Sequence, residues 1–221
     1  METVVKIKAI ETLTHNVKKF RCEKPHGYTF LPGQATEVAI NKKGWEKEKR
    51  PFTFTSLNES PELEFIIKLY KDHPGVTHEL DSLKIGDELI VDDAWGAISY
   101  QGSGYFIAGG AGITPFIAIL RQLHQEQKLA GNRLFFSNKT EHDIILQPEL
   151  TAMLDNNVIY AITSESSNNY YSGYINESFL KTYVQDFSQH FYVCGPPPMV
   201  EDLQSILAKL GACPETVVFE K

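Results

Sequence analysis

The spacing of hydrophobic positions divides the chain into two halves. Up to about residue 100, short apolar segments of strand character are separated by turn signals such as Pro32-Gly33 and Gly86-Asp87. This rhythm is typical of an antiparallel β-barrel. The predicted strands are residues 4–10, 17–22, 35–40, 52–56, 63–69 and 88–91, and the one helix predicted in this half is residues 76–83.

Beyond Gly104 the period changes. Apolar runs at residues 105–108, 133–137, 158–163 and 190–194 alternate with segments of helical spacing. The predicted helices are one built around residues 116–123, then residues 148–154, 176–187 and 199–210. Alternation of strand and helix predicts a parallel sheet covered by helices on both faces.

Charge and cysteine content narrow the classes of partner. The formal net charge of -7 over 221 residues argues against nucleic acid, because binding phosphates requires a basic surface. The three cysteines, Cys22, Cys194 and Cys213, form no zinc or iron-sulfur motif. We therefore expect free thiols in a reducing cytoplasm and no metal.

One stretch is long and uncharged enough to raise the question of a membrane. Residues 94–120 carry no charged side chain, and by length alone they could span a bilayer. However, the stretch contains six glycines and Pro115, which indicates strand, turn and helix. Since the N-terminus shows no signal peptide either, we expect a cytoplasmic protein without a membrane segment.

The most informative local motif is YFIAGGAGITPF, residues 105–116. A hydrophobic strand runs into Gly109, Gly110 and Gly112, and Thr114 and Pro115 are suited to the N-cap and first position of a helix. Glycines let the backbone approach a pyrophosphate closely, and a helix N-terminus offers free amides. A proline stands where the fingerprint G-x-G-x-x-G has its third glycine. The alternative, a helix cap with glycines needed for packing, stays open.

A second motif, CGPPPM at residues 194–199, follows another strand and precedes a helix. In a parallel sheet the end of that strand can lie beside the nucleotide crevice. Taken alone, Cys194 fits equally well as a small buried hydrophobe, which is the usual place of a free cysteine.

Four motifs taken in order resemble the ferredoxin-NADP reductase superfamily in its compact, flavodoxin-reductase-like form. They are RPFT (50–53), HPGVTHEL (73–80) with GDEL (86–89), GGAGITPF (109–116) and CGPPPM (194–199). The resemblance covers essentially the whole chain. It implies a flavin-binding antiparallel β-barrel at residues 1–101, followed by an α/β Rossmann-like parallel-sheet nucleotide-binding domain at residues 102–221.

The resemblance also implies roles for individual residues. Arg50 would pair with the FAD pyrophosphate, since guanidinium matches phosphate in a bidentate way. Phe52 would lie against the flavin, and Thr53 near flavin N5. The flavin set is Arg50, Pro51, Phe52, Thr53, Lys68, Tyr70, Gly75, Val76 and Thr77. The nicotinamide set is Gly109, Gly110, Gly112, Thr114, Pro115, Cys194, Gly195, Pro196 and Met199.

Thr53, Cys194 and Glu220 are the residues that the resemblance places at the reacting atoms. The chain departs from the family in two places. Relatives often have tyrosine where Phe52 stands, and many end with an aromatic residue that covers the flavin. This chain ends VVFEK, so the flavin face is either open or covered by Phe219.

Residues expected near the adenosine ribose bear on the choice of nucleotide. Lys139 is the only base after the second strand of the second half, and Glu165 stands after the third. A 2'-phosphate calls for arginine or lysine, so this pattern favours NADH over NADPH. The alternative, that both side chains face solvent, stays open.

The family implies an NAD(P)H-dependent reductase that passes single electrons to flavodoxin, ferredoxin or another acceptor protein. Lysines in the segment 41–50 could dock an acidic redox protein, although its interspersed glutamates fit a solvated hairpin as well. Two alternatives remain: the reductase component of a multicomponent oxygenase, and a non-catalytic flavin-binding or nucleotide-binding redox sensor. We expect a monomer.

Overall fold

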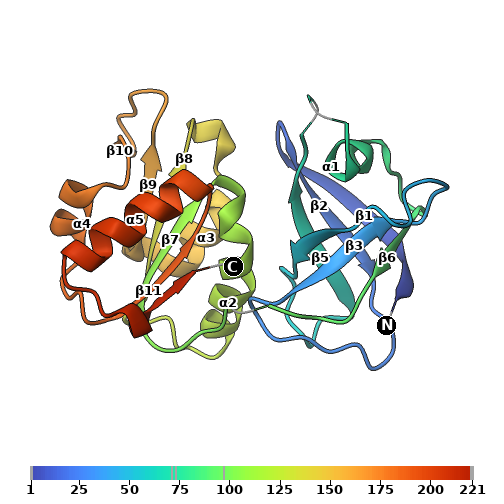
Figure 1. Ribbon diagram of the computed structural model, residues 1–221, viewed down its shortest axis with the longest axis horizontal. Coiled ribbons are helices and arrows are strands. Elements are labelled where there is room, and N and C mark those ends of the chain that lie inside the picture. Colours follow the sequence, from blue (N-terminus) through green and yellow to red (C-terminus); the bar gives the residue numbers. More distant parts are fainter. Residues whose placement is uncertain (1, 71, 73, 97, 220–221) are drawn as a thin grey trace.

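The computed structural model describes residues 2–70, 72, 74–96 and 98–219, which form two domains side by side (Figure 1). The first is a six-stranded antiparallel sheet in the order β4-β3-β6-β1-β2-β5. A bridge between Phe54 and Phe65 joins its two ends and closes the barrel. Its elements are β1 (Thr3–Thr14), β2 (Val17–Glu23), β3 (Ala35–Ile40), β4 (Arg50–Thr53), β5 (Glu62–Lys68), α1 (Val76–Glu79), a 3-10 turn (Leu80–Ser82) and β6 (Glu88–Val91).

The barrel forms because its strands alternate apolar and polar positions. In β1, Val5 and Ile7 are buried, whereas Lys6 and Lys8 between and beyond them are exposed. Fully buried aromatic side chains, Phe20, Phe54 and Phe65 among them, fill the interior. Each such side chain contributes about 1.5–3 kcal/mol through burial.

The second domain is a six-stranded parallel sheet in the order β10-β9-β8-β7-β11-β12. The predicted Rossmann-like fold is therefore confirmed. Its elements are β7 (Gly104–Gly109), α2 (Thr114–Gln125), β8 (Arg133–Asn138), α3 (Gln147–Leu154), β9 (Val158–Ile162), β10 (Tyr171–Ser172), α4 (Glu177–Tyr183), β11 (His190–Cys194), α5 (Pro197–Lys209) and β12 (Val217–Phe219).

Helices cover both faces of this sheet. Phe106 and Ala108 of β7 belong to the core beneath α2 and α3, whereas Tyr105 and Ile107 belong to the core beneath α4 and α5. A strand buried on both faces needs an uninterrupted apolar run, which is why the segment at 104–109 contains no charged residue.

The strand order brings the glycine motif after β7 next to the CGPPPM motif after β11. From β7 the chain builds outward through β8 and β9 in one direction, and β11 then pairs with the other edge of β7. The carboxyl ends of β7 and β11 therefore flank the point where the strand order reverses, which is where open parallel sheets bind ligands. The predicted domain boundary between residues 101 and 102 lies between β6 and β7 and stays a prediction.

Some local predictions were wrong. Thr114 is not the N-cap of α2, because a 3-10 turn (Gly110–Ile113) leads into the helix and the Thr114 hydroxyl donates to the carbonyl of Ala111. The strand predicted at 52–56 ends at Thr53, where the chain turns from β3 toward β5. The helix predicted to reach residue 187 ends at Tyr183, since the amide of Gln185 donates to the Tyr105 hydroxyl.

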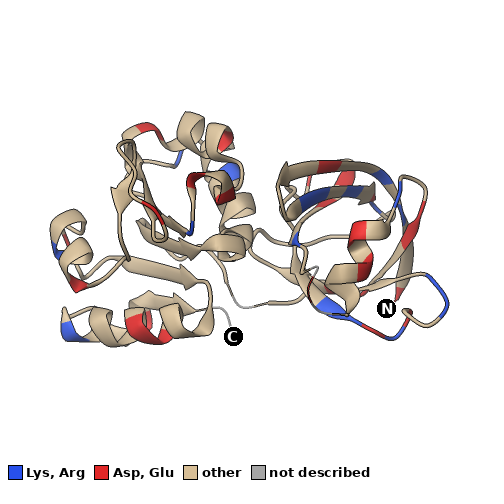
Figure 2. Ribbon diagram, turned by 90° about the horizontal axis from the view of Figure 1, so that it is seen from above, with Lys and Arg blue, Asp and Glu red and all other residues tan. Residues whose placement is uncertain are grey.

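One of the hydrophobic clusters extends across both domains. Val17, Ile66 and Ile98 of the barrel side pack with Phe116 and Leu120 of α2 in one buried cluster. Acidic and basic residues are interspersed over both domains (Figure 2). Within the described ranges, no helix is long and apolar enough to cross a membrane, and no group of three or more potential metal ligands occurs.

Candidate cofactor clefts

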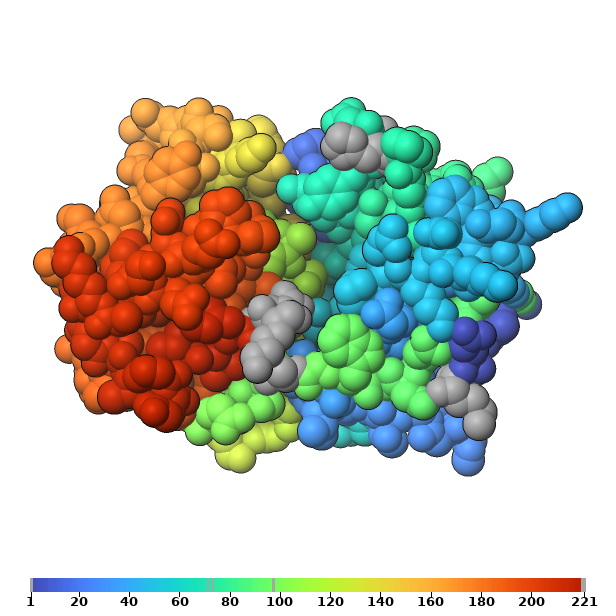
Figure 3. Space-filling view, viewed as in Figure 1, coloured from blue at the N-terminus to red at the C-terminus, as the bar shows by residue number. Residues whose placement is uncertain are grey.

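A cleft of about 670 Å³ lies between the barrel and the parallel sheet, where the surface is hollowed between the two domains (Figure 3). Both domains contribute to its walls. The residues proposed from the sequence that line it are Pro51, Phe52, Thr53, Lys68, Tyr70, Thr77, Gly109, Gly110, Gly112, Thr114, Cys194, Gly195 and Pro196. We call this the first cleft.

Strands β4 and β5 supply the barrel wall of the first cleft. Thr53 pairs with Ala35 of β3 and is 7% exposed, and the ring of Phe52 beside it is half-buried. At the end of β5, the Lys68 ammonium lies 5.8 Å from the centre of the Tyr70 ring. The residues of this wall therefore include a threonine, an aromatic ring and a lysine.

The glycines of the turn after β7 serve two purposes. A Cβ on Gly109 would lie 2.5 Å from Met199 Sδ, and a Cβ on Gly112 would lie 2.4 Å from the Cys194 carbonyl oxygen. Gly109 and Gly112 are thus required for packing between the two motifs, which is the alternative that the sequence left open. Gly110 differs, because its φ is +53° and a Cβ there would have no neighbour within 4 Å.

A second cleft, of about 450 Å³, lies at the carboxyl ends of β7, β8 and β9. It shares Lys68, Gly109, Gly110, Ala111 and Pro196 with the first cleft. Molecules bound in the two clefts would consequently meet at the Gly110 turn. Sequence reasoning missed part of its lining, namely Ser137, Asn138, Thr163, Tyr174, Asn176, Pro198 and Asp202.

Asn138, at the end of β8, lines the second cleft and is 4% exposed. Among the described residues, neither its amide nitrogen nor its amide oxygen has a hydrogen-bond partner. A buried orphan amide costs about 1–3 kcal/mol, and such groups in native structures call for an explanation. A polar ligand in this cleft is the explanation that the position suggests.

Four predicted flavin or nucleotide residues do not line either cleft. Arg50 is exposed at the head of β4, and its guanidinium donates to the Lys49 carbonyl at 2.6 Å. Val76 is buried in the barrel core, Pro115 is buried in α2, and Gly75 is the residue before α1. A Cβ on Gly75 would have no neighbour within 4 Å among the described residues, so packing against this part of the chain does not require glycine there.

The two residues predicted near the C-terminus, Phe219 and Glu220, have different outcomes. Phe219 lies in β12 beside Val193 and packs on the core beneath α4 and α5, so it does not cover the first cleft. Glu220 lies outside the described residues.

Sequence reasoning missed Trp95, which lines the first cleft and is 43% exposed. Its only sequence signal was a tryptophan in a loop of small and acidic residues.

The two clefts fit a flavin and a nicotinamide dinucleotide. The first is a concave site with apolar rings, a lysine and open space beside glycine backbone, which suits a flat ring system joined to a pyrophosphate. The second begins at the switch point of the sheet and contains an unpaired amide. Phe52, Thr53 and Trp95 would border the flavin ring, and Gly110 and Cys194 would border the nicotinamide.

Comparison with known proteins agrees with this division. Residues 4–100 match the sequence family of oxidoreductase FAD-binding domains, and residues 106–205 match that of oxidoreductase NAD-binding domains. A ferredoxin NADP+ reductase from Neisseria gonorrhoeae, solved with bound FAD and NADP, has the same fold, with a TM-score of 0.88. The alignment covers 99% of this chain and 98% of that one at 22% identity.

Two curated relatives have longer chains. NADH-cytochrome b5 reductase 2 of Coccidioides immitis is 31% identical over 88% of this chain and 66% of its own length. The anthranilate 1,2-dioxygenase electron transfer component of Acinetobacter baylyi is 28% identical over 80% of this chain and 54% of its own length. Residues 4–100 and 106–205 therefore belong to the oxidoreductase FAD-binding and NAD-binding domain families, in a chain that has the fold of a ferredoxin NADP+ reductase.

Proposed function

We propose that this chain is an NADH-dependent flavoprotein reductase that delivers electrons to a separate one-electron carrier protein. The observation that carries the proposal is the meeting of the two clefts at Gly109, Gly110 and Ala111. A nicotinamide in one cleft and a flavin in the other would lie next to each other there. Proximity of this kind is the main contribution that a protein makes to hydride transfer.

A bound flavin supplies the redox chemistry, because it accepts a hydride and releases electrons one at a time. The chain holds and orients the two partners. Thr53 borders the flavin ring on the barrel side, and Cys194 faces the same cleft from the end of β11. A buried apolar cluster with members from both domains lies between these two walls and holds the domains together.

Charges around the second cleft support NADH as the nucleotide. Its described lining includes two basic residues, Lys68 and Lys139, and two acidic residues, Asp143 and Asp202. This lining has no excess of positive charge for a 2'-phosphate. Glu165 adds to the acidic character nearby, where its carboxylate accepts a hydrogen bond from the Glu141 amide at 2.9 Å.

We propose a carrier protein as the acceptor, of the cytochrome b5, ferredoxin or flavodoxin type. A curated relative is an NADH-cytochrome b5 reductase, and the three cysteines of this chain form no iron-sulfur motif. Two of the hairpin lysines are paired with acids of the chain, Lys42 with Asp87 and Lys49 with Asp92. These pairs favour a solvated hairpin over a docking site at residues 41–50.

A second candidate is the reductase component of an oxygenase. The similarity to the anthranilate dioxygenase electron transfer component favours it. In that case the acceptor would be an iron-sulfur protein of an oxygenase system, and it would be reduced faster than a b5-type cytochrome.

The test uses purified protein reconstituted with FAD. Anaerobic addition of NADH should bleach the visible flavin absorbance faster than the same concentration of NADPH does. A flavin that neither nucleotide bleaches would sink the proposal. Turnover with excess cytochrome b5, ferredoxin or flavodoxin then ranks the acceptors, whereas bleaching without turnover on any acceptor, ferricyanide included, would identify a redox sensor.

A further inference from the structure

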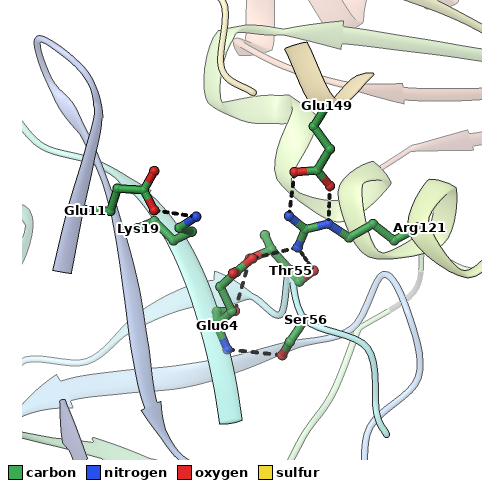
Figure 4. A network of polar contacts seen from close by, with 7 residues as sticks. All are labelled: Glu11, Lys19, Thr55, Ser56, Glu64, Arg121 and Glu149. Atoms are coloured by element: carbon green, nitrogen blue, oxygen red, sulfur yellow. Dashed lines mark hydrogen bonds and ion pairs between the residues drawn. The ribbon is translucent and has the colours of Figure 1, made fainter. Parts of the chain in front are cut away.

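Arg121 joins the two domains through a polar network (Figure 4). It lies in α2, and its Nε and Nη2 donate to the two carboxylate oxygens of Glu149 in α3, at 2.5 and 2.9 Å. Its Nη1 crosses to the barrel, where it donates to Glu64 Oε1 at 2.6 Å and to the Thr55 carbonyl at 2.7 Å. One guanidinium therefore binds groups from both domains.

The position of this network relates it to the two clefts. Thr55 stands two residues after Thr53 of the first cleft. The helix that carries Arg121 begins at Thr114, directly after the glycine turn that both clefts share. Arg121 thus links the helix that follows the shared glycine turn to the barrel segment that follows Thr53 and to strand β5.

The hydrogen bonds of Arg121 are directional, whereas the apolar contacts between the domains are not. The shared core of Val17, Ile66, Ile98 and α2 is apolar, and apolar contact holds surfaces together without fixing their register. A planar guanidinium with bidentate and single bonds fixes both distance and angle. The Thr55 hydroxyl adds a bond to Glu64 Oε1 at 2.8 Å, which orients the carboxylate on the barrel side.

Electrostatics keeps the network intact. The side chains of Arg121, Glu64 and Glu149 are 19%, 13% and 34% exposed. Burial by itself lowers the pKa of the guanidinium, but the two carboxylates outweigh it, so the pKa of Arg121 lies above its ordinary value. Compared with apolar side chains in the same places, buried ion pairs of this kind add little net stability, because desolvation offsets attraction, although removal of one partner leaves the others unpaired. Stability alone therefore does not account for the network, whereas the fixed directions of its bonds do constrain geometry.

We infer that Arg121 is a positioning residue that sets the distance between nicotinamide and flavin through Glu64 and Thr55. This inference rests on the proposed function. It requires that the loss of Arg121 slow the reduction of FAD at saturating NADH and leave both bound. A misplacement of about 1 Å can slow such a step by about a hundredfold.

The experiment measures FAD reduction by anaerobic stopped flow in the FAD-loaded protein. Arg121→Met should reduce the flavin about tenfold more slowly or worse, with NADH affinity and flavin spectrum unchanged. Arg121→Lys should recover part of the rate, since an ammonium can contact Glu64 but cannot bind Glu149 in a bidentate way at the same time. The control is Arg21→Met, which removes an arginine paired with Glu62 of the same strand β5, within the barrel alone.

A comparison of two conservative variants separates positioning from simple loss of charge. Glu64→Gln weakens the bond across the domains, whereas Glu149→Gln weakens a bond within the second domain. The inference predicts a slower rate in the first than in the second. Equal rates in these two variants would overturn it, and so would a wild-type rate in Arg121→Met.

Two further outcomes have defined meanings. If Arg121→Met does not fold, a triple variant that also carries Glu64→Gln and Glu149→Gln replaces it, because it leaves no unpaired buried carboxylate in the network. The comparison of Glu64→Gln with Glu149→Gln still tests the inference in that case. If the wild-type protein is not reduced by NADH or NADPH, the proposed function fails. If it is reduced and the Arg121 and Glu64 variants match it, only the inference about Arg121 fails.

Discussion

Gly112 and Cys194 are in backbone contact: a Cβ on Gly112 would lie 2.4 Å from the carbonyl oxygen of Cys194. The two residues belong to motifs that are far apart in the sequence and lie at the ends of neighbouring strands β7 and β11. Both residues line the first cleft, next to the Gly110 turn that the two clefts share.

Glycine substitutions should separate packing from cofactor binding. Gly112→Ala forces a backbone shift, and we expect it to lower the free energy of unfolding by about 1–3 kcal/mol or more. Gly110→Ala meets open space and costs only the left-handed backbone, about 1–2 kcal/mol, but its methyl group enters the clefts and should weaken nucleotide binding. Urea unfolding and NADH titration measure the two effects.

Gly27 is the matched control for Gly110. Its φ is +76°, and a Cβ there would also have no neighbour within 4 Å, although it lines neither cleft. Gly27→Ala should therefore cost similar stability without changing nucleotide affinity. Equal affinity losses in the two variants would show that Gly110 has no special place in the site.

Arg50→Ala should weaken FAD binding while the fold persists. Hydrogen bonds to charged groups contribute about 1.5–3 kcal/mol, which corresponds to a loss of affinity of about 10- to 100-fold. The guanidinium is exposed and bonded only to its neighbour's carbonyl among the contacts described, so its removal leaves the barrel unstrained. Arg21→Ala is the control, and full FAD occupancy in Arg50→Ala would refute the role of Arg50.

Asn138→Leu should stabilise the protein without ligand and weaken NADH binding. Leucine has a similar size and removes the orphan amide, so we expect the free energy of unfolding to rise by about 1 kcal/mol. NADH affinity should fall by about tenfold, equivalent to about 1.4 kcal/mol. Thermal unfolding without nucleotide and NADH titration measure these opposite changes.

Asn132 provides the contrast to Asn138. It is 1% exposed, but its amide accepts from the Gly104 backbone and donates to the Tyr100 hydroxyl. Asn132→Leu should therefore destabilise the fold and leave NADH affinity unchanged. Destabilisation by Asn138→Leu of the same size would mean that the Asn138 amide is satisfied within the protein.

The stability of the protein should fall at alkaline pH because of Cys22. Burial, with Glu62 and Glu23 nearby, raises the pKa of this thiol from 9.0 to about 12. Between these values the unfolded state has lost the proton and the folded state keeps it, so stability decreases by about 1.4 kcal/mol per pH unit. Below pH 9.0 the effect is absent.

Cys22→Ala tests this dependence through its slope. The variant has a small cavity and, below the ordinary thiol pKa, a lower stability than the wild type. Its urea midpoint should fall less steeply between pH 9 and 10.5 than that of the wild type, a range chosen to lie above the ordinary thiol pKa. The exposed Cys213 serves as the control position. Parallel slopes in wild type and Cys22→Ala would exclude Cys22 as the cause.

Local sequence was sufficient for the type and order of the longer elements, though not for all of their ends. Strands and helices with a clear period of hydrophobic positions, such as those at 35–40, 88–91 and 190–194, occur as predicted, because the period itself decides which side chains can be buried. The edge strands β10 and β12 contain only two and three residues, which is too short for any period to show. Thr114 was misplaced because a 3-10 turn and a helix have the same start signals.

Contacts between distant segments were decided by the tertiary structure. The sequence could not tell whether the glycines after β7 serve packing or a ligand, since the answer depends on Met199 and Cys194, which reach Gly109 and Gly112 only when β11 pairs with β7. The buried, unpaired amide of Asn138 and the hydrogen bonds of Arg121 to both domains also depend on several elements meeting at one place. Hydrophobic periodicity is a property of one segment, whereas a site of this kind is a property of the distances between segments.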